Sequence, residues 1–268
     1  TYRNILNYFQ PKYLLGLTAT PARTDEFDIL RDVYDGNLVY EIDQYEAVQK
    51  GYLVPCEYNF LKDNIDYTNI TWHGSKYYEE DLNEKLLVPK RDRKIIEEYK
   101  SLNPKPLKTL GFCIGIKHAE RMAEVFNKEG IKSRAIHSGN KDFPLSKENR
   151  KKYTKEFEKS KIEVAFVKDI FNEGIDIKQI DCLFILRPTE SSTIAIQQLG
   201  RGLRLAPGKD KLRVLNFIGK NQRNSFLPYD EFIGDPPLNE KGEYIYDNGN
   251  KVIFSKELVN IFKQQNAL

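Results

Sequence analysis

Five short apolar runs between residues 109 and 218 alternate with segments that have the periodicity of amphipathic helices. Several runs are apolar at nearly every position, as expected for strands of a parallel sheet buried between two layers of helices. Strands linked by helices in this way form right-handed crossovers. The pattern therefore predicts an α/β fold. The predicted strands are residues 109–114, 135–137, 162–167, 182–186 and 214–218.

The helix expected between the first two strands has one apolar face. Ala119, Met122, Ala123 and Phe126 follow the i, i+3, i+4, i+7 spacing of a buried helix side. Gly130 can end the helix, because glycine adopts a left-handed cap conformation without strain. The spacing predicts that these four side chains pack against the sheet.

Serines are placed to start the two later helices. Ser146 is a good N-cap, since its hydroxyl can accept a hydrogen bond from the first turn. The helix that follows it is expected to turn Tyr153 and Phe157 toward the sheet. Ser191 or Ser192 can cap the helix after the fourth predicted strand.

The regions that flank this alternation predict fewer elements. A helix end and then a strand at residues 13–17 are expected near the start, and a strand at residues 57–61 follows later. Residues 63–90 have no clear period and are expected to form loops with one helix. Two apolar runs within residues 244–254 flank Asp247–Asn250, whose residues tolerate positive φ, and this predicts a β-hairpin.

Charge alone does not identify a partner. Charged residues make up 30% of the 268 residues, but the formal net charge is only +3. This balance does not support a bulk electrostatic attraction to nucleic acid. Basic residues cluster locally at 90–94 and 150–152, and we interpret both clusters as solvated helix faces.

The cysteine pattern and the hydropathy favour an intracellular protein. The three cysteines are scattered without CxxC spacing, which argues against a disulfide framework and predicts a reduced, cytoplasmic setting. No apolar run approaches the roughly 20 residues needed to span a bilayer. The chain begins at Thr1 and its single methionine is Met122, so we expect it to be part of a longer polypeptide.

Three short motifs occur in a fixed order. They are Leu-Thr-Ala-Thr-Pro at 17–21, Asn-Glu-Gly-Ile-Asp at 172–176 and Gln-Gln-Leu-Gly-Arg-Gly-Leu-Arg at 197–204. They resemble motifs III, V and VI of superfamily 2 DEAD/DEAH-type helicases and translocases, and residues 111–119 look like motif IV. The resemblance implies a RecA-like parallel sheet sandwiched by helices, the second lobe of such a motor, with a small C-terminal extension that contains the hairpin.

Arg201 and Arg204 have the chemistry that phosphoryl transfer requires. Residues at i and i+3 share a helix face, so both guanidinium groups can reach into one cleft and meet phosphate oxygens with a planar fork. Gly200 and Gly202 would leave room for another surface to approach. An isolated pair of arginines would indicate an ordinary surface helix, but the Asn-Glu-Gly-Ile-Asp motif upstream favours a catalytic role.

Other residues of these motifs are expected on the nucleotide side. Gly174 permits a tight turn at the carboxyl end of a strand, where α/β folds bind ligands. Asp176 could accept hydrogen bonds from a ribose hydroxyl or fix the arginines, and Gln197 would line the same site. The resemblance also implies that Thr18 and Thr20 couple the nucleotide state to the grip on nucleic acid.

A further group is expected to contact nucleic acid. The resemblance implies that the strand and loop with His137 and Gly139, and Arg150 downstream, lie against the nucleic-acid backbone. Lys168 stands where many relatives carry a hydroxyl residue, and a lysine there could meet a phosphate as a point charge. His118 and His137 have no second ligand at metal spacing, so no metal site is predicted.

The chain lacks the groups that would hold ATP phosphates and magnesium. It contains no G-x-x-x-x-G-K-[ST] run and no Asp-Glu-x-His box. The resemblance implies that ATP and Mg²⁺ are cofactors of the full-length protein, bound largely by a first lobe, and that this chain alone is inactive. We expect the end of that first lobe and a linker at 1–45, the second lobe at 46–222 and the extension at 223–268.

The runs at 186–191 and 217–219 suit the bacterial branch related to restriction-enzyme motor subunits. The expected partners are nucleic acid, with DNA favoured, and restriction-modification subunits, without a membrane. One alternative is a non-catalytic nucleic-acid-binding module that keeps the lobe fold. A metabolic enzyme on a doubly wound sheet would need a G-x-G-x-x-G loop, which residues 111–115 lack.

Overall fold

The computed structural model describes residues 2–18, 29–73, 76–102, 106–168, 177, 179–188, 192–220, 222, 243–245 and 249–258. The strands within them are β1 (Cys56–Asp66), β2 (Trp72–His73), β3 (Lys76–Tyr77), β4 (Thr109–Phe112), β5 (Ser133–Ile136), β6 (Val164–Val167), β7 (Cys182–Ile185), β8 (Leu212–Lys220), β9 (Glu243–Ile245) and β10 (Lys251–Phe254). The helices are α1 (Tyr2–Phe9), α2 (Ile29–Tyr34), α3 (Gln44–Gln49), α4 (Glu79–Leu86), α5 (Pro89–Leu102), α6 (Ile116–Lys128), α7 (Lys147–Glu158) and α8 (Ser192–Gly202).

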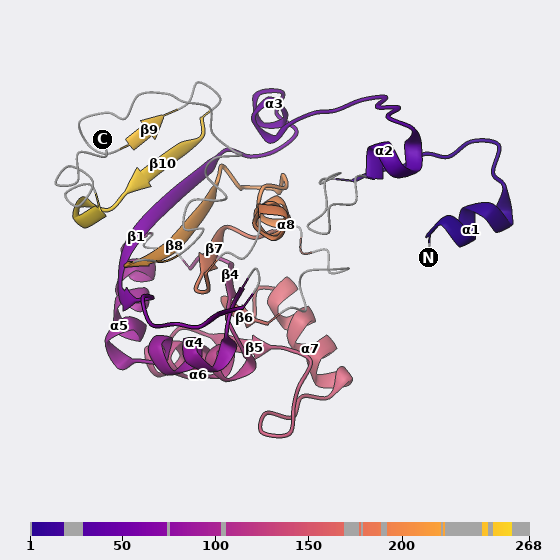
Figure 1. Ribbon diagram of the computed structural model, residues 1–268. Coiled ribbons are helices and arrows are strands. Elements are labelled where there is room, and N and C mark those ends of the chain that lie inside the picture. Colours follow the sequence, from indigo (N-terminus) through magenta and orange to yellow (C-terminus); the bar gives the residue numbers. More distant parts are fainter. Residues whose placement is uncertain are drawn as a thin grey trace.

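Eight of the described strands form one twisted sheet (Figure 1). Their order is β5-β6-β4-β7-β8-β1-β10-β9. Neighbours from β5 to β10 pair in parallel, and β9 joins β10 in antiparallel fashion at the edge. The predicted α/β fold with a parallel sheet is therefore confirmed, and all five predicted central strands are present.

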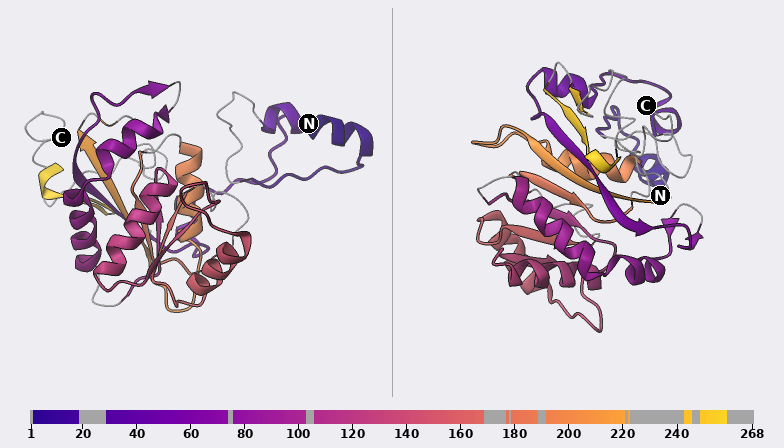
Figure 2. Two further views of the ribbon diagram at one scale, coloured as in Figure 1. Left: turned by 90° about the horizontal axis from the view of Figure 1, so that it is seen from below. Right: turned by 90° about the vertical axis from the view of Figure 1, so that its left-hand side faces the viewer.

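Helices cover both faces of the sheet (Figure 2). Every residue of β4, β6 and β7 is buried, because these central strands lie between the two helical layers. One core cluster includes Phe157 of α7 with Leu199 of α8 and Leu203, which directly follows α8. The other includes Met122 and Phe126 of α6. Burying each such side chain contributes about 1.5–3 kcal/mol to folding.

The helix predictions hold in detail. Ala119, Met122, Ala123 and Phe126 of α6 are all buried, and Gly130 has a φ of 78° just after the helix. Ser146 caps α7, where its Oγ accepts a hydrogen bond of 3.1 Å from the Asn149 N–H. Tyr153 packs against the first cluster and Phe157 lies within it. Helix α8 begins at Ser192, and residue 191 lies outside the described residues.

The predicted hairpin of β9 and β10 is present, and it extends the central sheet. β10 pairs in parallel with β1, which pairs on its other side with β8. Asn250 reinforces this junction, because its Oδ1 accepts a hydrogen bond of 2.8 Å from the Cys56 N–H. The strand expected at 57–61 is longer than predicted, since neighbours on both sides supply hydrogen-bond partners.

The strand expected at residues 13–17 is absent from the structure, and this prediction is wrong. Tyr13 and Leu17 are 94% and 92% exposed. The segment lies between α1 and α2, which stand away from the sheet (Figure 1). A strand needs a hydrogen-bonding neighbour, and the described part of the chain offers none at this place.

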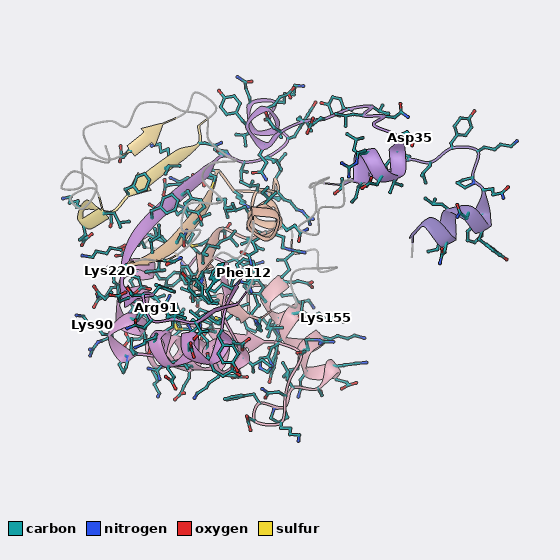
Figure 3. All side chains as sticks on the ribbon, in the orientation of Figure 1. Asp35, Lys90, Arg91, Phe112, Lys155 and Lys220 are labelled. Atoms are coloured by element: carbon teal, nitrogen blue, oxygen red, sulfur yellow. The ribbon has the colours of Figure 1, made fainter. Side chains whose placement is uncertain are left out.

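The charged segment at 90–94 is not the solvated helix face that its sequence suggested. Arg91 and Asp92 are 4% and 2% exposed, although Lys90 beside them is exposed. Figure 3 shows Lys90 and Lys155 at the periphery of the molecule and Arg91 inside it. Arg91 pairs with Asp63 of β1 and Asp92 pairs with Arg121 of α6, so tertiary partners decide the burial of these charges.

Among the described residues, no helix is both long and apolar enough to cross a bilayer.

Candidate functional site

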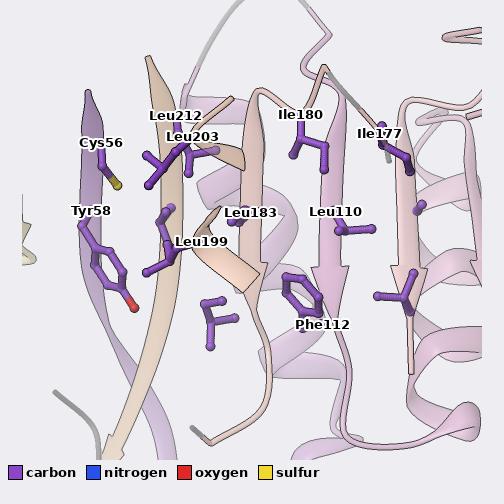
Figure 4. Packing of buried hydrophobic residues seen from close by; sticks show 14 of the residues in the cluster. Cys56, Tyr58, Leu110, Phe112, Ile177, Ile180, Leu183, Leu199, Leu203 and Leu212 are labelled. Atoms are coloured by element: carbon purple, nitrogen blue, oxygen red, sulfur yellow. The ribbon is translucent and has the colours of Figure 1, made fainter. Parts of the chain in front are cut away.

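Helix α8 presents one face to the sheet. Gln198, Leu199 and Leu203 are nearly fully buried, and Leu199 and Leu203 share a core cluster with Leu212 of β8. A Cβ at Gly202 would lie 2.5 Å from Cδ1 of Leu212. Glycine at this position therefore allows the end of α8 to lie close to β8, and Figure 4 shows Leu203 beside Leu212.

The candidate nucleotide residues follow the opposite face of α8. Gln197 and Arg204 are exposed, and Gly200 and Arg201 are partly exposed, at the spacing i, i+3, i+4 and i+7. No heavy atom lies within 4 Å of the place where a Cβ of Gly200 would stand. Partial burial lowers the pKa of Arg201, but a guanidinium stays charged at physiological pH. This face therefore offers two cations beside an open stretch of backbone.

Arg204 lies beyond the end of α8, which stops at Gly202. Instead of a helical turn, Arg204 forms an isolated antiparallel bridge with Leu53. The Val54 N–H also donates a hydrogen bond of 2.9 Å to the Leu203 carbonyl. The chain that leads into β1 therefore holds Arg204, and the two arginines are not on one continuous helix as expected.

Other predicted nucleotide-side residues lie outside the described part of the chain. These are Gly174 and Asp176, and of the two residues predicted to couple nucleotide state to nucleic-acid grip, Thr20 also lies outside it whereas Thr18 is described and exposed. Ile177, which follows Asp176 in the sequence, is buried in the same core cluster as Leu199 and Leu203. The described chain directly after the predicted motif V therefore packs on the side of the sheet that α8 covers.

His137 shapes the loop that follows β5. Its side chain is 1% exposed, and its Nε2 lies 2.7 Å from Oε1 of Glu120 on α6. Its Nδ1 accepts a hydrogen bond of 3.0 Å from the Gly139 N–H, so Nε2 carries the proton and donates to Glu120. Gly139 has a φ of 81°, and a Cβ there would lie 2.9 Å from the backbone nitrogen of Leu145. The hydrogen bonds of His137 with Glu120 and with Gly139 therefore fix the loop.

Lys168 stands at the end of β6, at the same edge of the sheet as this loop, because β5 and β6 are parallel neighbours. Its Nζ lies 3.3 Å from Oε2 of Glu79, the first residue of α4. The carboxylate of Glu79 also lies against Gly115, which precedes α6. Arg150, in the first turn of α7, is partly exposed after the Gly139 loop. The structure thus places His137, Gly139 and Lys168 at one edge of the sheet.

Sequence reasoning missed three residues that support these sites. Glu120 and Glu79 hold His137 and Lys168, and Lys209 donates to the carbonyl groups at the end of α8. No local sequence pattern predicts the roles of the two glutamates, because each pairs with a residue that only the fold brings close to it. Lys209 directly follows Gly208 and lies a few residues beyond Gly202, the last residue of α8. A lysine that closely follows the end of a helix can cap the carbonyl groups of that end.

Comparisons with known proteins agree with this architecture. Residues 91–206 match the family model of the helicase conserved C-terminal domain. "Putative ATP-dependent helicase IRC3" of Saccharomyces cerevisiae is 28% identical over 227 residues, which cover 82% of this chain and 32% of that protein. The type I restriction enzyme EcoAI endonuclease subunit of Escherichia coli is 27% identical over 234 residues, which cover 79% of this chain and 28% of that protein. The chain thus spans about a third of the length of these curated relatives.

A solved structure shows the same fold. It is "The fragment structure of a putative HsdR subunit of a type I restriction enzyme from Vibrio vulnificus YJ016", with a TM-score of 0.66 and 20% identity, and the match covers 94% of this chain and 46% of that chain. The resemblance to superfamily 2 helicases and to restriction-enzyme motor subunits is confirmed, since residues 91–206 match the helicase conserved C-terminal domain and the relatives include helicases and a restriction-enzyme subunit.

Proposed function

We propose that this chain is the second RecA-like lobe of an ATP-dependent DNA helicase or translocase, of the kind that drives type I restriction enzymes. The observation that carries the proposal is the outward face of α8. Gln197, Gly200 and Arg201 lie on this face and Arg204 lies just beyond the end of the helix, whose other side packs against the sheet. A helix packed in this way can hold its cations in place while a second domain approaches.

The outward face fits the phosphate groups of ATP. Open space at Gly200 lets a phosphate come close to the backbone, and Arg201 and Arg204 can supply positive charge to it. ATP with Mg²⁺ supplies the phosphoryl group and its metal countercharge when bound. We assign the phosphate loop and the magnesium ligands to another lobe, because these 268 residues contain neither motif.

The role of the arginines follows from charge. Negative charge on the transferred phosphoryl group must be stabilised in the transition state, and a preorganised guanidinium does this with little reorganisation. Arg201, which is partly buried, meets this need better than a fully solvated side chain, because its charge is less screened. Asp176 and Gln197 would contact the nucleoside side of the same site.

We assign contact with DNA to the edge of the sheet that follows β5 and β6. Gly139 presents backbone in a loop fixed by His137, and Lys168 and Arg150 supply positive charge near it. Such contacts bind phosphates and position the protein without reading sequence. In this proposal His137 supports the loop, because both of its ring nitrogens already have protein partners.

The experiment is a DNA-stimulated ATPase assay on the full-length protein that contains this chain. Arg201→Ala and Arg204→Ala should each lower kcat by about a thousandfold or more. Arg93→Ala, an exposed arginine on α5, is the matched control and should leave kcat unchanged. If Arg204→Ala retains full stimulated turnover, the catalytic proposal is wrong and the alternative, a nucleic-acid-binding module that keeps the lobe fold, is favoured.

A further inference from the structure

A partly buried lysine, Lys209, closes the end of the helix that carries Arg201. The chain turns after α8 through Gly208, which has a φ of 75°, and the Lys209 N–H donates a hydrogen bond of 3.1 Å to the Ala206 carbonyl. This turn sends the Lys209 side chain back to the helix. Its Nζ donates to the carbonyl oxygen of Gly202 and, at 3.3 Å, to the carbonyl oxygen of Arg204.

These two carbonyl groups are where a cation is most useful. The Gly202 carbonyl belongs to the last turn of α8, where carbonyl groups have no partner within the helix and form the negative end of its dipole, and the Arg204 carbonyl lies just beyond it. An ammonium group has three donors and can satisfy more than one of them. On its other side the same backbone is held by the bridge from Arg204 to Leu53 and the hydrogen bond from Val54 to Leu203. Lys209 completes a two-sided clamp on the backbone of Arg204.

We propose that Lys209 is a positioning residue for Arg204. Its ammonium group fixes the backbone from Gly202 to Arg204, and so it sets the direction in which the Arg204 side chain leaves the protein. Lys209 does not touch the reacting groups and acts through Arg204. This inference rests on the proposed function, in which Arg204 supplies charge to the phosphoryl group.

The surroundings of Lys209 make its charge depend on pH near neutrality. Burial lowers the pKa of Lys209 to about 8, while the carboxylate of Asp181 and the Cys56 thiol act in the opposite direction. The ammonium group of Lys209 is therefore mostly charged at neutral pH and loses its charge as the pH rises above about 8. An arginine at this position would keep its charge throughout that range.

The test uses the full-length protein in the DNA-stimulated ATPase assay. Lys209→Met should lower kcat by about 10- to 100-fold and leave the KM for ATP nearly unchanged, as expected when a catalytic group is displaced by about 1 Å. Lys209→Arg should restore most of kcat and should keep it above pH 8, where the wild type declines. Lys211→Met is the control, because Lys211 belongs to the same turn but pairs with Glu57 at 2.5 Å.

A double-mutant cycle separates this inference from the proposed function. If Lys209 acts through Arg204, adding Lys209→Met to Arg204→Ala should cause no further loss of kcat. A further loss of the same size in the double variant, or unchanged kcat in Lys209→Met beside a damaged Arg204→Ala, overturns the positioning role alone. Unchanged kcat in Arg204→Ala overturns the proposed function itself. If Lys209→Met does not fold, Lys209→Arg still decides, since a positioning role predicts its altered pH profile.

Discussion

Nε of Arg91, in the first turn of α5, lies 2.6 Å from Oδ2 of Asp63 on β1, and both side chains are almost fully buried. The same guanidinium donates from Nη2 to the Leu186 carbonyl at 3.2 Å, directly after β7. A buried ion pair thus joins the long strand β1, helix α5 and the end of β7, ahead of the segment that leads to α8. Because β1 also receives the C-terminal hairpin, this contact links distant parts of the chain.

We predict that Arg91→Met destabilises the protein by about 3–5 kcal/mol, because it leaves the Asp63 carboxylate buried without its partner. The double variant Arg91→Met with Asp63→Leu should recover most of that loss, since removing both charges also removes their desolvation cost. Urea unfolding of the wild type and the variants measures both effects. A double variant no more stable than Arg91→Met would show that packing or the Leu186 contact, rather than the orphaned charge, causes the loss.

The positive φ of Gly139 leads to a second prediction. Gly139→Ala should cost more stability than Gly130→Ala, although the two glycines have φ values of 81° and 78°. A left-handed conformation costs an alanine about 1–2 kcal/mol in either case. Only at Gly139 does the new Cβ also meet the backbone of Leu145, whereas nothing lies within 4 Å of it at Gly130.

The measurements for this comparison are urea unfolding and DNA binding by the full-length protein. Gly139→Ala should also weaken DNA binding, because the loop that His137 fixes must move. Gly130→Ala should leave binding unchanged. Equal losses of stability in both variants would show that the contact with Leu145 relaxes without cost.

Local patterns predicted the central layer of this fold. Ala119, Met122 and Phe126 could be assigned to a buried helix face because periodicity reports burial on a continuous surface. Residues 13–17 could not be assigned correctly, since a strand exists only where another strand pairs with it. Their composition is that of a strand, but the described structure leaves Tyr13 and Leu17 in solvent.

The geometry of the candidate site was not predictable from the spacing of its residues. The spacing of Arg201 and Arg204 predicted that they share one helix face, but α8 stops between them. That end depends on Leu53 and Lys209, which meet Arg204 only in the folded chain. Gly174 and Asp176 lie outside the described residues, and their roles remain predictions.

A third prediction concerns Lys168 and Glu79 in DNA binding. If Lys168 neutralises one phosphate, Lys168→Gln should reduce the slope of log K against log salt by about 1, because one fewer counterion is released. Glu79→Gln should tighten binding, since it removes the carboxylate 3.3 Å from the amine. Lys128→Gln, on the exposed face of α6, is the control, because Lys128 pairs with Glu124 in a comparable surface ion pair. A salt slope that Lys168→Gln leaves unchanged would exclude this phosphate contact.

The lowered pKa of Lys209 predicts a specific pH dependence of stability. The pKa is about 8 in the folded protein against an ordinary value of 10.5, so between these values the unfolded chain binds a proton that the folded chain does not. The free energy of unfolding therefore rises as the pH increases from about 8 to 10.5. It falls again when the pH decreases through the same range. The urea midpoint of the wild type should therefore rise relative to that of Lys209→Met from pH 7.5 to pH 10. Other titrating groups are common to both proteins and cancel in the difference. Lys211→Met tests whether loss of any lysine in this turn has the same effect. Parallel curves for the wild type and Lys209→Met would show that folding does not lower the pKa of Lys209, and the predicted decline of the wild type above pH 8 would then be wrong.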